Sequence, residues 1–102
     1  MRPVNWADEA RRNLVDIIEY IYTDSPAAAY RVADKIAECA SSLSDMPTGR
    51  PGRVKGTYEK VVFGLPYILA YVIDEQADGS EVIYLLRVIH GARDWTPDAW
   101  PK

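Results

Sequence analysis

The stretch that decides the fold is YEKVVFGLPYILAYVIDEQADGSEVIYLLRVIH, residues 58–90. Aromatic and β-branched residues dominate three parts of it, as they do in β-strands. Gly64-Leu65-Pro66 and the polar loop 74–80 separate these parts with residues typical of turns. Such short connections predict an antiparallel meander. The expected strands are Tyr58–Phe63, Tyr67–Ile73 and Val82–His90.

Upstream of the meander, the first predicted helix covers residues 7–22, where apolar residues recur at helical spacing. Asn5 is a candidate helix cap, with Asp8 as an acid in the first turn. Residues 4–6 are a candidate edge strand. The apolar positions of this helix are Leu14, Ile17, Ile18 and Ile21.

The second predicted helix covers residues 26–43, with Ser25 as its cap and Pro26 at its first position. Its inner stripe is rich in alanine, which predicts close packing against a neighbour. The short connection between the helices predicts an antiparallel helical hairpin. The stripe consists of Ala29, Ala33, Ile36, Ala37, Ala40 and Leu43.

This order of elements predicts a two-layer α+β domain, with the helical hairpin packed on one face of an antiparallel sheet of three to four strands. A chain of 102 residues suits one domain, spanning residues 1–102. The other face of the sheet is expected to be less covered, and partners often dock on such a surface.

Composition narrows the classes of function. The single cysteine, Cys39, excludes an internal disulfide framework and a cysteine-based zinc site, and we expect no metal or cofactor. A net charge of −3 and a pI near 5.0 weigh against direct DNA binding by this chain alone. The first residues lack the apolar core of a signal peptide, and the apolar runs are too short to cross a bilayer. We therefore expect a cytoplasmic protein.

Seven short pieces, in this order and spacing, make nearly the whole chain resemble the RelE/ParE family of toxins. The most telling piece is residues 86–93 on the last predicted strand. The others are Trp6-Ala7-Asp8-Glu9-Ala10, Ile17-Ile18-Glu19-Tyr20-Ile21, Ser25-Pro26-Ala27-Ala28-Ala29, Gly49-Arg50-Pro51-Gly52, Gly56-Thr57-Tyr58-Glu59 and Pro66-Tyr67-Ile68-Leu69-Ala70-Tyr71, and the last piece reads Leu86-Arg87-Val88-Ile89-His90-Gly91-Ala92-Arg93.

The resemblance implies a toxin that a co-expressed antitoxin neutralises, in a hetero-oligomer of the two proteins. A disordered antitoxin segment would lay a helix in a groove or add a strand to the sheet. RelE-like members cut mRNA on the ribosome with basic residues, whereas ParE-like members poison DNA gyrase. The resemblance leaves both targets open.

The RelE-like ribonuclease pattern matches this chain poorly. Aligned without a gap, its two lysine positions fall on Glu59 and Val61, and its middle-strand arginine position falls on Ile68. Lys60 is one residue away, but alternation along a strand turns it to the opposite face. Losing one charge-stabilising donor typically costs about 2.7–4 kcal/mol of barrier. Arg93 alone matches, so we expect a ParE-like protein that is not an enzyme, with the ribonuclease as the alternative.

Several residues remain candidates for contacts with the target or the antitoxin. His90 is a structural strand end, a contact residue or, with Arg93, part of a nuclease site. Arg87 either pairs with an acid such as Glu59 or belongs to the antitoxin-covered surface. The other candidates are the basic cluster Arg50, Arg53 and Lys55, the aromatic Tyr58, and Trp95 of the C-terminal tail. The alternative interpretation is that the basic cluster belongs to a solvated loop and that the two aromatic residues contribute only packing.

Three hypotheses follow for function. The first is a gyrase-binding toxin without catalysis of its own. The second is a ribosome-dependent endoribonuclease that uses Arg93 and His90. The third is a family member that binds its antitoxin but poisons nothing.

Overall fold

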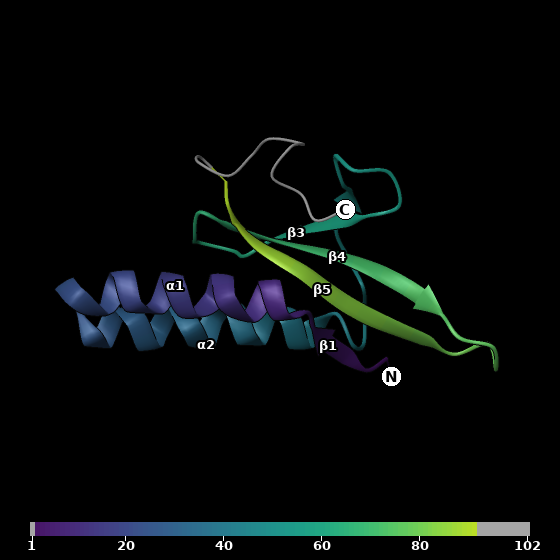
Figure 1. The fold of residues 1–102 in the computed structure, drawn as a ribbon, viewed down its shortest axis with the longest axis horizontal. Helices are drawn as coiled ribbons and strands as arrows, with labels where there is room; N and C mark the ends of the chain where they lie inside the picture. The colour runs from purple at the N-terminus through teal and green to yellow at the C-terminus, as the bar shows by residue number, and fades with distance from the viewer. Residues whose placement is uncertain (1, 92–102) are drawn as a thin grey trace.

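In the computed structural model, which describes residues 2–91, a helical hairpin packs on one side of a twisted sheet (Figure 1). The sheet has five strands in the order β1-β5-β4-β3-β2. The free end of the hairpin extends beyond the sheet. The elements are β1 (Val4–Trp6), α1 (Asp8–Asp24), α2 (Pro26–Ser42), β2 (Arg50–Pro51), β3 (Tyr58–Val61), β4 (Tyr67–Glu75) and β5 (Glu81–His90).

The two-layer α+β architecture is confirmed, but the sheet has more strands than expected and is mixed. β1 pairs with β5 in parallel, with Val4 opposite Ile83. A parallel neighbour needs a long crossover, which the helical hairpin helps to supply. β2 adds a fifth strand, in which Arg50 lies opposite Glu59. Two residues are too few for an alternating pattern, so the sequence did not reveal this strand.

The helix ends agree with the sequence at α2 and differ at α1. The Ser25 hydroxyl accepts a hydrogen bond from the backbone N–H of Ala28 at 3.2 Å, and Pro26 opens the helix as expected. At α1 the N-cap is Ala7, which has no side chain that can cap. Asn5 is not the cap, because it lies within β1.

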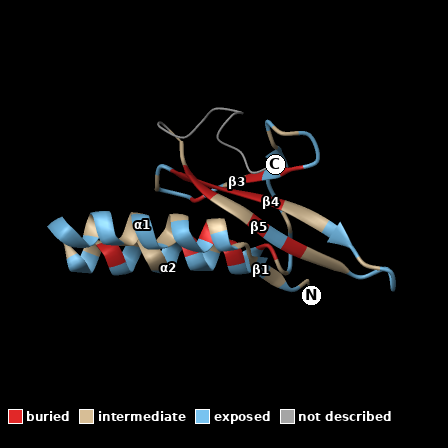
Figure 2. Ribbon diagram, viewed as in Figure 1, coloured by how far each residue is buried: buried red, intermediate tan, exposed pale blue. Residues whose placement is uncertain are grey.

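The main core fills the space between helices and sheet, and buried residues lie on the central strands and at intervals along the helices (Figure 2). Of the predicted alanine stripe, Ala37 is exposed and Ala33 is only half-buried, so the buried stripe is narrower than expected. The largest fully buried side chains are Tyr71, Ile36, Leu43, Leu69, Ile83, Leu85, Ile89 and Val62.

The sheet face away from the helices is more covered than expected. Ile68, Ala70 and Ile89 form a second, smaller core on this face, and Val54 packs against them from the loop between β2 and β3. A β-bulge interrupts the pairing of β4 with β5, so that Ala70 lies opposite Arg87 while Tyr71 lies opposite Leu85. The bulge resets the alternation of β5 and puts Arg87 on the same face as this smaller core. No helix among residues 2–91 is long and apolar enough to cross a membrane.

Candidate functional site

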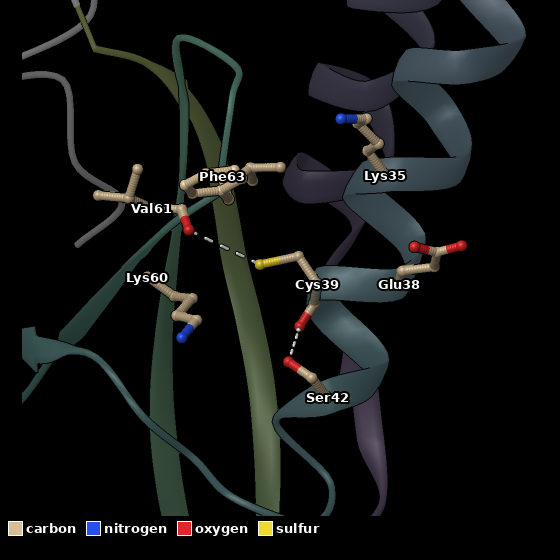
Figure 3. A pocket seen from close by; sticks show the side chains of 8 residues that line it. Lys35, Glu38, Cys39, Ser42, Lys60, Val61 and Phe63 are labelled. Carbon is tan, nitrogen blue, oxygen red and sulfur yellow. Dashed lines mark hydrogen bonds between the residues drawn. The ribbon is translucent and has the colours of Figure 1, made fainter.

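A groove of about 510 Å³ lies between α2 and the end of β3 (Figure 3). α2 contributes one wall, and the strand and the turn after it contribute the other. Side chains alternate along β3, so Lys60 lies on the other face from Glu59 and Val61, as expected, and points toward α2. Phe63 lies in the turn that follows β3. The lining residues are Lys35, Glu38, Cys39, Ser42, Lys60, Val61, Val62 and Phe63.

The aromatic side chain at this groove is unusually exposed. Phe63 is 91% exposed, although most apolar groups of this size lie inside small domains. Val61 lines the groove with its backbone carbonyl, while its side chain points away from α2 (Figure 3). Lys35 and Lys60 line the same groove, and the Lys60 ammonium donates a hydrogen bond to the Thr48 hydroxyl at 2.6 Å. The groove therefore combines an apolar surface with a largely basic rim.

Cys39 lies in the floor of the same groove. Its thiol contacts the carbonyl oxygen of Val61 at 4.0 Å. Burial raises the pKa of this thiol, and the nearby Lys60 ammonium opposes the shift. A thiol held in its protonated form is a poor nucleophile, so Cys39 contributes packing rather than chemistry. Cys39 itself is half-buried at this groove.

Glu59 organises the opposite face of the sheet. Its side chain is 1% exposed, one carboxylate oxygen lies 3.5 Å from Arg50 Nε, and the other accepts a hydrogen bond from the Arg53 backbone N–H at 3.0 Å. Arg87 lies in the same cross-strand row, with Ala70 between the two residues. Glu59 and Arg87 therefore lie on the same face, two strands apart, as their expected pairing requires. Glu59 forms an ion pair with Arg50.

The three positions that correspond to ribonuclease cations come together on this face. Val61 lies opposite Ile68, and Glu59 lies opposite Ala70, which is the next residue pair on the same face of the sheet. Ile68 is 9% exposed and belongs to the smaller core. Two apolar side chains and a carboxylate at these three positions supply no positive charge to a phosphate.

The remaining candidates lie apart from one another. Tyr58 stacks on Tyr71 with ring centroids 5.6 Å apart, on the helix side of the sheet, and Lys55 is exposed in the β2–β3 loop. His90 ends β5, where its ring meets the Tyr67 ring edge-on at 5.5 Å. Arg93 and Trp95 lie outside the described residues. Among residues 2–91, no cluster of three His, Cys, Asp or Glu side chains could hold a metal ion.

Sequence reasoning missed the α2–β3 groove. Phe63 was predicted as the end of a strand, and Lys35 was not singled out. The available signal was the only phenylalanine of the chain, placed directly before the turn glycine Gly64. Only the packing of α2 beside β3 shows that these residues share one groove.

The comparisons with known proteins specify the family. Residues 4–95 match the family described as "ParE toxin of type II toxin-antitoxin system, parDE". The chain therefore belongs to the ParE toxin family of type II toxin–antitoxin systems.

Two relatives match most of the chain, and one solved structure shares its fold. The putative toxin Y4kP of Sinorhizobium fredii is 38% identical over 93 residues, covering 90% of this chain and 91% of that protein. Toxin RelE2 of Caulobacter vibrioides is 33% identical over 93 residues, covering 91% and 99%. The chromosomal ParDE system of P. aeruginosa contains a chain with the same fold, at a TM-score of 0.77 and 21% identity, covering 88% of this chain and 96% of that one.

Proposed function

We propose that this toxin stops growth by binding DNA gyrase and has no ribonuclease activity of its own. The observation that carries the proposal is the face opposite the helices, where Val61, Ile68 and Glu59 occupy the positions at which a ribonuclease of this fold needs cations. Membership of the ParE family supports the choice of gyrase.

The second candidate is a ribosome-dependent endoribonuclease that uses Arg93 and His90. The likeness to a relative named Toxin RelE2 favours it, as does the position of His90 beside a hollow next to α1. Mapping of mRNA 3′ ends after induction of the toxin without antitoxin separates the two candidates. We expect growth to stop with mRNA left uncut. Codon-phased cuts that disappear when Arg93 and His90 are both replaced by alanine would support the ribonuclease instead.

The same induction tests whether the protein is toxic at all. Normal growth, with the folded toxin present at the expected level, would contradict both candidates and leave a chain that only binds an antitoxin. Growth arrest that a co-expressed antitoxin reverses is the result that the proposal requires.

We further propose that the cognate antitoxin docks in the α2–β3 groove. The exposed Phe63 offers an apolar anchor, and Lys35 and Lys60 favour a segment that carries acidic side chains beside its apolar ones. Aromatic anchors of this kind often dominate binding. A disordered antitoxin segment could fold into such a groove as it binds.

The variant Phe63→Asp tests the groove, with Val15→Asp as the matched control. Val15 is 50% exposed on α1 and does not line the groove. We expect Phe63→Asp to weaken antitoxin binding by about tenfold or more, as loss of one interface anchor usually does. Calorimetric titration of both variants measures this. Equal affinities for the two variants would place the antitoxin elsewhere.

A further inference from the structure

A separate hollow of about 260 Å³ lies between α1 and the ends of β4 and β5. α1 contributes one side through residues one helical turn apart, and the strands contribute the other through Tyr67, Val88 and His90. Neither the gyrase proposal nor the antitoxin groove uses it. Its lining residues on α1 are Asn13, Asp16, Ile17 and Tyr20.

The acidic group of this hollow is Asp16. Its basic neighbours on α1 are engaged elsewhere, because Arg12 lies 3.9 Å from Glu9 and Arg11 lies 3.3 Å from Asp8. None of the ion pairs found within residues 2–91 includes Asp16. Its carboxylate is therefore available to a cation from outside the chain.

Aromatic rings accompany this carboxylate. Tyr20 follows Asp16 by four residues, so both side chains lie on the same face of α1. The Tyr20 side chain is 73% exposed, whereas Tyr67 is 7% exposed and forms part of the wall with His90. An exposed tyrosine next to an acid can cover a cation with the face of its ring.

We infer that this hollow receives an arginine side chain from a protein partner. A guanidinium is planar and always charged, it forms paired hydrogen bonds with a carboxylate, and it stacks on aromatic rings. Asp16 and Tyr20 offer these two contacts side by side. A lysine ammonium fits less well, because it is a compact and strongly hydrated charge. An anion would be repelled by Asp16.

The surroundings indicate a basic protein segment as the partner. The exposed acids Glu19 and Asp24 follow Asp16 along α1, and the last turn of this helix carries no basic residue. Such a surface attracts a positively charged partner and repels a second copy of this chain, whose net charge is −3. The inference does not rest on the proposed function, since it concerns the chemistry of this hollow whatever the target of the toxin is.

The test is a titration of the isotope-labelled full chain with the blocked tripeptide acetyl-Gly-Arg-Gly-amide, followed by NMR. We expect saturable shifts at the amides of Asp16, Tyr20 and His90, and weaker binding of the corresponding lysine tripeptide. The variant Asp16→Asn should weaken arginine binding by about fivefold, as for loss of a partly exposed charge pair. Asp34→Asn, which removes an exposed acid of α2 outside the hollow, should leave the affinity unchanged.

Tyr20 gives an independent check of the same site. Tyr20→Leu should weaken binding of the arginine tripeptide, whereas Tyr30→Leu, at a tyrosine that is 63% exposed on α2, should not. The inference would be overturned by shifts that do not saturate, by equal affinity for the lysine tripeptide, or by Asp16→Asn and Tyr20→Leu binding as tightly as their controls.

Discussion

Glu59 shows how a single buried carboxylate can hold a loop in place. It anchors the β2–β3 loop through the Arg53 backbone N–H, while its partner Arg50 is 61% exposed and adds little through charge alone. We expect Glu59→Ala to lower the free energy of unfolding by about 1–3 kcal/mol, because it leaves a part-buried N–H without its acceptor. Urea denaturation measures this. Glu75→Ala, at an exposed position near the end of β4, serves as the control, and an equal loss there would contradict this role.

Tyr71 links the sheet to the segment before β2. Its hydroxyl donates to the carbonyl oxygen of Thr48 at 2.8 Å, and its ring is fully buried. Burial raises the pKa of this hydroxyl above 10.0, and the neighbouring Tyr58 adds to the shift. The Tyr71 hydroxyl thus stays protonated to a higher pH in the folded protein than in the unfolded chain. The resulting stability is present below about pH 10 and is lost as the pH rises through the folded pKa.

Absorbance titration of tyrosinate tests this behaviour. We expect Tyr71→Phe to remove a late-titrating tyrosine and to destabilise the fold by about 0.5–1.5 kcal/mol through the lost hydrogen bond. Tyr30→Phe, at an exposed tyrosine, should leave both the late-titrating group and the stability unchanged. A late-titrating group that persists in Tyr71→Phe would contradict the assignment.

At the scale of the elements, α1 protects the edge of β5 beyond the short strand β1. β1 pairs with β5 only as far as Leu85, and the Asn13 side chain then accepts a hydrogen bond from the Val88 backbone N–H at 3.1 Å. We expect Asn13→Ala to speed hydrogen exchange at the Val88 amide and to cost about 1–2 kcal/mol of stability. Asn13→Asp keeps an acceptor and should keep the protection. Unchanged exchange in Asn13→Ala would show that the edge is protected by other means.

At the scale of the molecule, the periodic spacing of apolar residues and the positions of turn residues predicted the two-layer architecture. The helical hairpin and the three-stranded meander follow from apolar periodicity and turn residues, which report local structure. The pairing of β1 with β5 and that of the two-residue β2 with β3 depend on contacts between separate segments of the chain. Apolar periodicity therefore could not predict either pairing.

The candidate site was predictable only in part, for the same reason. The residues at the three RelE-type cation positions could be identified by aligning single residues, and the register then placed Val61 opposite Ile68. The α2–β3 groove and the hollow beside Asp16 each combine a helix with a strand far from it in the chain. Neither was predicted, because no local pattern marks which residues will meet across the two layers.

The central claim is that this toxin acts on DNA gyrase by binding it. The most direct test is a supercoiling and cleavage assay with purified gyrase and toxin freed from its antitoxin. The account predicts blocked supercoiling or accumulation of cleaved DNA, reversed when antitoxin is added. Unaffected gyrase in the presence of toxin shown to be folded would contradict it and would make the ribosome the first target to examine.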